Sequence, residues 1–550
     1  MKNNHFFSSR KKYNDIKYIV FYVFLTICWI VIIALCSYFF LVRQFYKADL
    51  SLSPVIVKII MILNFLFLSL LYCDGFKNFC FVVMYYISYA KKQILPKNDY
   101  INEIYKTNKI ISKKADIPKV LLLYTTRNDF DENSLLCSMN QEYENYSVYI
   151  LDDSNDKSYI EKINNFVKKF ESGVYLIRRN NNKGFKAGNI NNFLKNYKNY
   201  DYFVLLDSDE IIPKDFISKS LMYFKGNKNI GIVQANHTSN RYTNSFEKSG
   251  AIGVFSGAST SLTMREIFGI PTLYGHGAII SKECYEDVGG FPEIVSEDIG
   301  FLIDALYIGY EIAFAKNIIC DEKFPIDYLS FKKRSIKWTQ GNCELFKKKW
   351  KKIIKLPQPF WKKLDLWMNI TSVSFSVMSF FVITLNFTIL YPLNFSYDFF
   401  PIWIVFIVIF MIVPFLNQIL YFILIDKKRW WLFIRVIIFN YFLFPSLLIT
   451  SCATVIFSIF GKKAKFIVTP KNSKKYSLKD AIKYSWLELI FAVALIIFFI
   501  FTYIYIPNIK NINFIWLFLV ILPMISSPLL ILMSNKKIYK IIRKEKKYES

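Results

Sequence analysis

The chain has 550 residues, of which 53% are hydrophobic, and its 54 Phe and 37 Tyr make it more aromatic than an ordinary soluble protein. The formal net charge is +28, but no recognised module interleaves the basic residues with base-stacking aromatics, which argues against nucleic-acid binding. The nine Cys residues never form a Cys-x-x-Cys pair, so neither a zinc site nor a disulfide framework is predicted.

Six apolar segments are long enough to cross a hydrocarbon core, which requires roughly 20 helical residues. They cover residues 18–42, 54–73, 367–391, 400–425, 486–506 and 514–534. The first is too long and too aromatic for a cleaved signal peptide, so we expect it to remain as an anchor. Basic clusters beside these segments belong in the cytoplasm by the positive-inside rule. We therefore expect a multi-pass plasma-membrane protein with both termini in the cytoplasm.

Two further apolar stretches fit a single crossing less well. Residues 431–460 carry basic clusters at both ends and include Pro445, so we expect interfacial or re-entrant helices there. Residues 76–90 are too short to span a bilayer, and they either extend the second helix or lie along the surface.

The long apolar runs stop between residues 96 and 360, where short strand-like segments alternate with helical patterns. The strand-like segments are residues 119–124, 147–153, 173–179, 202–209 and 230–235. This alternation predicts a mostly parallel sheet covered by helices, with ligands at the carboxyl ends of the strands. The chain then divides into an N-terminal membrane region (1–95), a cytosolic α/β domain (96–360) and a C-terminal membrane region (361–550).

The stretch VLLDSDE (204–210) runs an apolar strand directly into three acids. Burying carboxylates is costly unless a positive group lies against them. Asp207 and Asp209, two residues apart, offer oxygen ligands for a hard divalent cation that also takes diphosphate oxygens. The plainer interpretation is that they cap the following helix.

Three more stretches carry polar groups at comparable places. Asp152 and Asp153 follow a strand, where they either accept hydrogen bonds from a nucleotide or begin a turn. Lys186 lies in a glycine-flanked helix start that suits an anion. Glu297 and Asp298 begin an amphipathic helix, where they either favour the helix dipole or place Asp298 as a general base.

In their order, these motifs resemble those of the processive, membrane-integrated family 2 glycosyltransferases, the group of cellulose, chitin and hyaluronan synthases. The resemblance covers roughly residues 115–475 and implies a GT-A-type catalytic domain. It assigns Asp298 as the catalytic base and Asp207 and Asp209 as ligands of Mg²⁺ or Mn²⁺. The residues that it implies for nucleotide-sugar binding are Thr125, Arg127, Asp129, Asp152, Asp153, Lys186, Gly188, Arg334 and Lys337. Those that it implies for acceptor binding are Trp338, Glu297 and His276.

The chain departs from the family pattern in the motif RSIKW (334–338). Arg334 stands where glutamine is usual, and Lys337 replaces an arginine, which keeps the charge but loses the bidentate fork. This form, together with YGHGAII (274–280), looks more like the osmoregulated periplasmic glucan glucosyltransferases. The stretch KFIVTPK (465–471) resembles a gating loop of cellulose synthases and, in that likeness, contributes Phe466, Val468, Thr469 and Lys471.

The resemblance implies an inverting, metal-dependent hexosyltransferase that polymerises a UDP-sugar, with UDP-glucose as the expected donor, into a β-linked polysaccharide and passes it across the membrane. Its partners would be the donor, the growing polysaccharide and membrane lipids; the sequence leaves open whether an accessory protein or a homo-oligomer takes part. The alternative enzyme transfers one sugar to a lipid carrier. A transporter with a soluble regulatory domain would leave the order of the acidic motifs unexplained.

Overall fold

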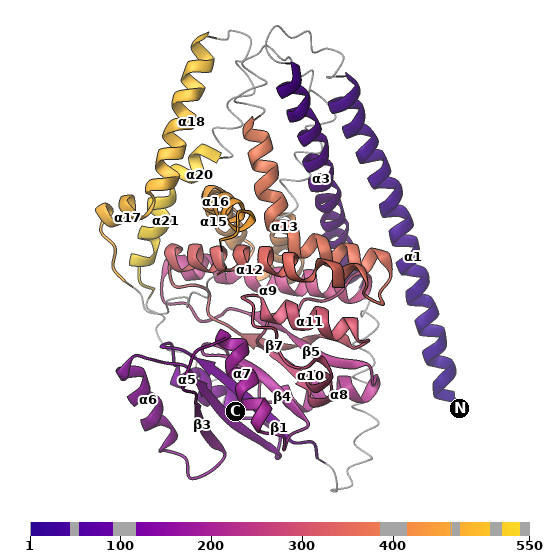
Figure 1. Cartoon of the computed structure of the whole chain (residues 1–550), viewed down its shortest axis with the longest axis vertical. Coiled ribbons are helices and arrows are strands. Elements are labelled where there is room, and N and C mark those ends of the chain that lie inside the picture. The colour runs from indigo at the N-terminus through magenta and orange to yellow at the C-terminus, as the bar shows by residue number, and fades with distance from the viewer. Residues whose placement is uncertain are drawn as a thin grey trace.

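The computed structural model describes residues 2–43, 54–91, 117–385, 415–462, 464, 474–505 and 520–538. Figure 1 shows a sheet-containing domain at one end and helices running along the long axis at the other. The helices α9 (Ser245–Phe268) and α12 (Tyr328–Ile354) lie across that axis, between the two parts.

Among the described residues, seven strands form one mixed sheet in the order β3-β2-β1-β4-β6-β5-β7. All neighbouring strands are parallel except β6, which runs antiparallel to both β4 and β5. Their bounds are β1 Val120–Thr126, β2 Tyr146–Asp152, β3 Val174–Arg178, β4 Tyr202–Asp207, β5 Ile230–Thr238, β6 Ala278–Ser281 and β7 Glu311–Asp321.

Helices cover both faces of this sheet. Successive strand residues point to opposite faces, so Leu123 and Leu205 pack into one apolar core and Leu122 and Leu206 into the other. The covering helices are α5 Glu132–Met139, α6 Lys157–Val167, α7 Phe185–Asn196, α8 Phe216–Gly226, α10 Lys282–Val288 and α11 Glu297–Tyr307. This three-layer arrangement confirms the predicted α/β domain.

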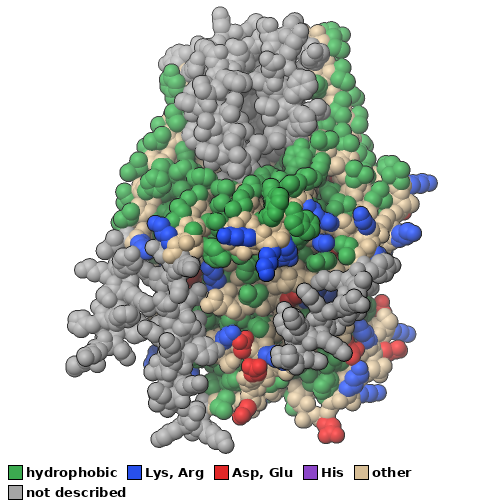
Figure 2. All heavy atoms as spheres, turned by 180° about the vertical axis from the view of Figure 1, so that it is seen from behind, with side chains coloured by type: hydrophobic (Ala, Val, Ile, Leu, Met, Phe, Trp, Pro, Cys, Tyr) green, Lys and Arg blue, Asp and Glu red, His purple; other side chains and the backbone are tan. Residues whose placement is uncertain are grey.

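The remaining helices are largely apolar. They are α1 Lys2–Ser37, α3 Pro54–Ala90, α13 Phe360–Leu385, α15 Leu432–Ser446, α16 Leu448–Ile459, α17 Leu478–Tyr484, α18 Trp486–Tyr505, α20 Leu522–Ile525 and α21 Ser527–Leu532, with short helical turns at Tyr38–Arg43, Tyr421–Ile425, Lys427–Arg429 and Met533–Asn535. Figure 2 shows a hydrophobic zone above a row of Lys and Arg side chains on one face of the molecule. That border is typical of a protein that meets a membrane surface.

By length and composition, three helices of the described part could cross a membrane: Lys17–Ser37, Val57–Ala90 and Leu432–Ile459. A fourth is added if Leu478–Tyr484 and Trp486–Phe501, bent by 72° at their break, form one span. Residues 76–90 continue the second helix, one of the two outcomes expected for them. The segment 431–460 forms α15 and α16, which together are long enough to cross, so the interfacial placement expected for it stays a prediction.

A buried ion network joins helices from the N-terminal and C-terminal parts of the chain. Lys77 Nζ on α3 lies 2.7 Å from Asp365 Oδ1 on α13, and both side chains are only 1% exposed. Arg265 Nε on α9 lies 3.1 Å from Asp365 Oδ2, and Asp74 lies 3.0 Å from Lys77. Because buried charges are stable only when paired, this network ties three helices from distant parts of the chain together.

Candidate active site

The carboxyl edge of the sheet gathers the charged residues of the site. Thr125 in β1 is the register partner of Asp207, the last residue of β4. Lys186, at the start of α7, extends to this edge, with Nζ 2.5 Å from Asp207 Oδ1 and 2.9 Å from the carbonyl oxygen of Gly275. The first acid of the Asp-x-Asp motif is therefore held by a lysine, and its side chain remains 41% exposed.

Lys186 is surrounded by acids. Burial alone would lower its pKa. Asp207, Glu297 and Asp298 more than offset that effect, so the pKa of Lys186 is raised and its ammonium stays charged. The motif after β4 and the motif at the start of α11 thus meet around one cation.

Glu297 and Asp298 are adjacent acids in the first turn of α11. Burial, followed by the charge of Asp298, raises the pKa of Glu297 to about 7 against the opposing charges of Lys186 and Lys337. Burial likewise raises the pKa of Asp298, although the backbone N–H of Ile299 donates a hydrogen bond of 2.8 Å to its Oδ1. A carboxyl group with a raised pKa is a stronger base than an exposed aspartate, which suits proton removal from a hydroxyl.

The helix α12 brings RSIKW to these acids. A Cβ at Gly341 would lie 2.4 Å from Ser296 Oγ, so only glycine lets α12 approach the residue that precedes Glu297 so closely. The charge of Lys337 then favours the ionised forms of both Glu297 and Asp298 and opposes the rise of their pKa values.

The first and last residues of RSIKW form a stacked pair of a cation and an aromatic ring. The guanidinium carbon of Arg334 lies 4.6 Å from the ring centroid of Trp338, within the range of a cation–π interaction. Burial lowers the pKa of Arg334, and the charges of Glu322 and Asp209 oppose that shift. The Trp338 ring is 49% exposed and offers an aromatic face beside the charged cluster.

Asp152 and Asp153 are both paired with arginines from the end of β3 and the residue after it. Arg178 Nε donates to Asp152 Oδ2 at 2.7 Å. Arg179 forms a bidentate pair with Asp153, at 2.8 and 2.6 Å, and both side chains are less than 10% exposed. A Cβ at Gly188 would lie 2.8 Å from Arg179 Nη1 and 2.0 Å from the Lys183 carbonyl oxygen, so glycine is required for this close packing.

The turn after β1 is fixed by Asp129. Its Oδ1 accepts hydrogen bonds from Thr126 Oγ1 at 2.9 Å and from the Arg127 backbone N–H at 2.8 Å. Its Oδ2 accepts one from Ser208 Oγ at 2.6 Å. Because Ser208 stands between the two acids of the Asp-x-Asp motif, Asp129 joins this turn to that motif. Thr125, in turn, donates to the Leu206 carbonyl oxygen at 3.2 Å.

The third acid of VLLDSDE is buried with two histidines. Glu210 Oε1 lies 3.1 Å from both His237 Nε2 and His276 Nδ1. Burial opposes ionisation of Glu210, but the charge and hydrogen bonds of the histidines outweigh it and lower its pKa to about 2. Conversely, burial lowers and Glu210 raises the pKa of His276, to about 10. Glu210 and His276 thus form a charged pair.

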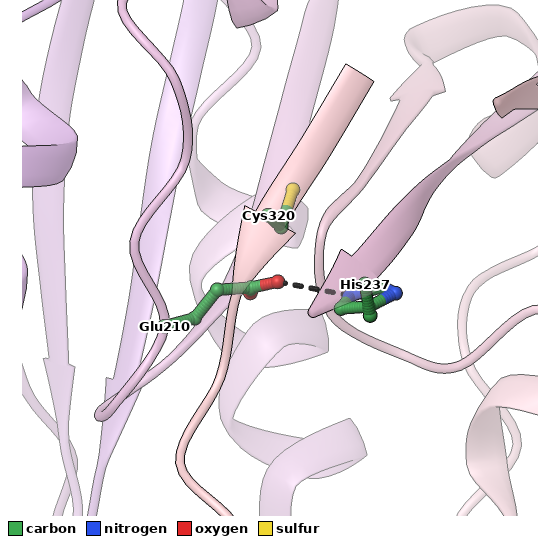
Figure 3. Close-up of side chains that lie close together, drawn as sticks. All are labelled: Glu210, His237 and Cys320. Atoms are coloured by element: carbon green, nitrogen blue, oxygen red, sulfur yellow. Dashed lines mark hydrogen bonds and ion pairs between the residues drawn. The ribbon is translucent and has the colours of Figure 1, made fainter. Parts of the chain in front are cut away.

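Cys320 completes a cluster that could hold a metal ion by distance, since its ligand atom and those of Glu210 and His237 lie within 4.8 Å of one another. Figure 3 shows Glu210 pointing to His237 at the end of β5, with Cys320 on the neighbouring β7. Burial raises the pKa of the Cys320 thiol well above its usual value, which keeps it protonated.

The structure therefore brings together Asp207, Lys186, Glu297, Asp298 and Lys337. The residues Phe466, Val468, Thr469 and Lys471 of the gating-loop-like stretch lie outside the described residues. Sequence reasoning missed Arg178 and Arg179, at the end of β3 and directly after it, and Glu210, three residues after β4.

It also missed Arg241, whose guanidinium donates to the Asp209 carbonyl oxygen and, at 2.7 Å, to that of Asp321. No sequence signal marks it, because Arg241 follows β5 and meets Asp209 only through the tertiary fold.

Three comparisons relate this chain to known proteins. Residues 202–530 match the model of glycosyl transferase family group 2. Over 231 residues the chain is 25% identical to an Arabidopsis thaliana protein named "Probable glucomannan 4-beta-mannosyltransferase 10". The matched stretch covers 40% of this chain and 41% of that protein. The chain thus spans about two fifths of that curated relative's length.

Solved structures give lower similarities. A mannosyltransferase, PcManGT, from Pyrobaculum calidifontis in complex with GDP-Man and Mn²⁺ superposes with a TM-score of 0.40 and 16% identity, covering 63% of this chain and 97% of the other. S. aureus TarS 1-349 in complex with UDP-GlcNAc superposes with a TM-score of 0.32 and 14% identity. The match covers 65% of this chain and 99% of the TarS chain. Scores this low add nothing to the family assignment.

The family match covers more than half of the chain, and its first residues, Tyr202 onward, are those of the strand that carries the Asp-x-Asp motif. It continues through the acids of α11, the whole of α12 and the apolar helices beyond. The α/β domain with its mixed sheet is accordingly a GT-A-like glycosyltransferase fold, and the chain belongs to glycosyl transferase family group 2.

Proposed function

We propose that this protein is an inverting hexosyltransferase that adds sugars from a nucleotide-activated donor, with UDP-glucose as the expected donor, to a growing β-linked polysaccharide. The observation that carries the proposal is the convergence on Lys186 of Asp207 from one motif and Glu297 and Asp298 from another. The name of the Arabidopsis thaliana relative, a mannosyltransferase, supports a hexosyl donor and adds a nucleotide-activated mannose to the donors worth testing.

In the proposed reaction, the acceptor hydroxyl attacks the anomeric carbon from the face opposite to the departing nucleotide diphosphate. Asp298 accepts the hydroxyl proton, a role that its raised pKa favours. Lys186 and Lys337 lie beside the acids and would stabilise the charge that grows on the diphosphate. Trp338, half exposed beside them, would support the acceptor sugar through its ring face.

We further propose that Asp207 and Asp209 hold a divalent cation, Mg²⁺ or Mn²⁺. Two carboxylates that follow a strand two residues apart, the first still 41% exposed beside Lys186, suit a hard cation that prefers oxygen ligands. When bound, the cation would supply Lewis-acid neutralisation of the diphosphate.

The nucleotide would occupy the edge formed by Thr125, Arg127, Asp129, Asp152 and Asp153. Since Arg178 and Arg179 already pair with Asp152 and Asp153, these acids would contribute to nucleotide binding together with their arginines. Glu297 and His276 remain the proposed acceptor contacts besides Trp338.

We also propose that synthesis is processive and that the product crosses the membrane. The basis for this is the apolar helices on either side of the catalytic domain in the sequence. The domain bounds 1–95, 96–360 and 361–550, the six crossings and the cytoplasmic placement of both termini belong to this proposal. It is supported by three helices in the described part of the chain that are long and apolar enough to cross, and by the basic border beneath the hydrophobic zone. The alternative, transfer of a single sugar to a lipid carrier, would need neither a passage nor an acceptor platform such as Trp338.

The test uses the purified full chain in nanodiscs with 10 mM-range Mg²⁺ or Mn²⁺, roughly the concentration that saturates a weak oxygen-ligand site. UDP-glucose, UDP-GlcNAc and GDP-mannose are supplied one at a time, and products are sized and digested with linkage-specific hydrolases. A ladder or high polymer supports the proposal. A product that stops at one lipid-linked sugar supports the alternative, and the absence of transfer from every donor contradicts both.

A further inference from the structure

The acid that follows the Asp-x-Asp motif is enclosed more completely than any acid of the proposed reaction. Glu210 is only 1% exposed. Its Oε1 lies within hydrogen-bond distance of His237 Nε2 and His276 Nδ1, both at 3.1 Å, and its Oε2 accepts the Gly277 backbone N–H at 2.9 Å. A buried carboxylate is tolerated only when its oxygens are satisfied in this way, so Glu210 is committed to the turn at residues 274–277.

That turn is shaped around Glu210. A Cβ at Gly277 would lie 2.5 Å from Glu210 Oε1, and the residue has a positive φ of 55°. Glycine is therefore needed on both counts. His276 is held from its other side as well, because its Nε2 lies 3.5 Å from Glu322 Oε2.

The same turn touches both halves of the proposed reaction centre. The Gly275 carbonyl oxygen accepts a hydrogen bond of 2.9 Å from Lys186, the lysine that pairs with Asp207. On its other side, a Cβ at Gly275 would lie 3.1 Å from the Cβ of Asp298, so the turn lies directly against that residue. The Glu210 backbone N–H also donates to the Asp207 carbonyl oxygen at 3.2 Å.

The contacts close a ring. It runs from Asp207 through Glu210 to the turn, and from the turn through Lys186 back to Asp207, with Asp298 packed against Gly275. We propose that Glu210 is a positioning residue, which fixes the 274–277 turn and thereby sets the distance between the Asp207–Lys186 pair and Asp298. The inference rests on the proposed glycosyl transfer, in which these two groups handle the leaving diphosphate and the acceptor proton.

A metal ion shared by Glu210, His237 and Cys320 would be a different use of the same residues. Two observations speak against it. Both Glu210 oxygens already accept hydrogen bonds from protein groups. His237 Nδ1 has no hydrogen-bond partner among the described residues, whereas a metal-bound histidine usually donates its second ring N–H to an acceptor.

The primary test compares Glu210→Gln with wild type in the nanodisc assay. Glutamine keeps the size but has one acceptor oxygen instead of two, so the turn loses either the hydrogen bond from Gly277 or the pairing with His276. Misplacing a catalytic group by about 1 Å costs roughly 100-fold in rate, and we expect kcat to fall by about that factor. The melting temperature should fall, because His276 loses its charged partner, whereas the Kd for UDP should stay close to wild type, which a collapse of the nucleotide-binding edge would not allow.

Cys320→Ala serves as the matched control, because Cys320 belongs to the same cluster without contributing a hydrogen bond to the turn. It should retain wild-type kcat. Bound zinc that survives dialysis against EDTA, and that is lost with activity in Cys320→Ala, would establish the metal site and overturn the inference.

A second pair of variants covers the case in which Glu210→Gln fails to fold. His276→Leu removes the Nδ1 donor and should lose activity as Glu210→Gln does, while His276→Asn restores a nitrogen donor at that place and should recover at least about tenfold of the loss. In an Asp298→Asn background, Glu210→Gln should cost much less than 100-fold, since coupled residues are not additive.

Equal kcat for Glu210→Gln and wild type would reject the inference alone and leave glycosyl transfer standing. If wild type transfers no sugar from any donor, the proposed function fails first and the inference falls with it.

Discussion

Asp298→Asn is the most direct test of the proposed reaction. Asparagine has the same shape, and its carbonyl oxygen can still accept the 2.8 Å hydrogen bond from the Ile299 N–H, so the start of α11 should keep its geometry. The substitution removes the group proposed to accept the hydroxyl proton. Because nothing else in the proposed centre moves, a loss of rate reports on proton transfer.

General bases contribute about 10²- to 10⁴-fold to the rates of enzymes, or about 3–5 kcal/mol in the activation free energy. Burial raises the pKa of Asp298, and Lys186 and Lys337 hold its ionised form in place. A base tuned in this way belongs in the upper half of the range, so we expect kcat to fall at least about 1,000-fold. The Kd for UDP should stay within about threefold, since the substitution removes no cation.

The assay measures nucleotide release and product length from pH 5 to 9, approximately the range in which a raised carboxyl pKa becomes visible. In wild type, activity should fall as the pH drops through the raised pKa of Asp298, and this acidic limb should disappear from the residual activity of Asp298→Asn. Asp287→Asn, which removes an exposed acid that accepts a hydrogen bond from Tyr310 Oη, is the control and should be fully active. Retention of more than a tenth of wild-type kcat by Asp298→Asn would refute the assignment.

Three further outcomes are expected. Because the pKa of Glu297 is raised to about 7, its contribution to stability is present below the ordinary glutamate pKa and lost as the pH rises through about 7; Glu297→Gln should remove this part of the pH dependence of the melting temperature, and an unchanged profile would contradict the burial argument. Asp365→Asn leaves Lys77 and Arg265 without their shared carboxylate and should cost about 3 kcal/mol of stability, the lower end for a broken buried pair because Asp74 remains near Lys77. Asp215→Asn, which breaks a partly exposed pair with Lys219, should cost under about 1 kcal/mol in the same thermal denaturation assay. EDTA should abolish sugar transfer and Mn²⁺ or Mg²⁺ restore it, with Asp209→Asn raising the metal concentration for half-maximal activity at least about tenfold; transfer that persists in EDTA would contradict the cation proposal.

The sequence predicted the first five strands because each is a short apolar run that ends at polar residues. It predicted a mostly parallel sheet but not the antiparallel β6, Ala278–Ser281, whose four residues are too few to give a periodic pattern. It also missed β7, which follows α11 after only three residues and reads as a continuation of the same amphipathic pattern. Both strands acquire their identity from pairing with β5, a contact that local sequence does not encode.

The residues of the candidate site likewise fall into two groups, those that the local sequence indicates and those that only the tertiary fold brings into place. Residues such as Asp207, Lys186 and Asp298 could be selected because their motifs recur in a fixed order, and the structure brings them together. The burial of Glu210 depends on His237 and His276, which lie 27 and 66 positions further along the chain. A third acid in a cluster looks like one more solvent-exposed charge until those partners are in place.

The helix α12 is a rod of 27 residues, about 40 Å long at the usual helical rise. One part of it lies against Ser296 through Gly341. Its C-terminal part contacts α11 a second time, because Lys349 and Lys352 both form ion pairs with Asp304. Lys347, in turn, donates to the Ser458 carbonyl oxygen of α16. Because α11 contacts α12 at two points, neither helix can tilt without the other. The ring of Trp338 and the carboxylate of Asp298 therefore keep a fixed position relative to each other. In the processive synthesis proposed above, the growing chain would therefore advance by sliding past this platform.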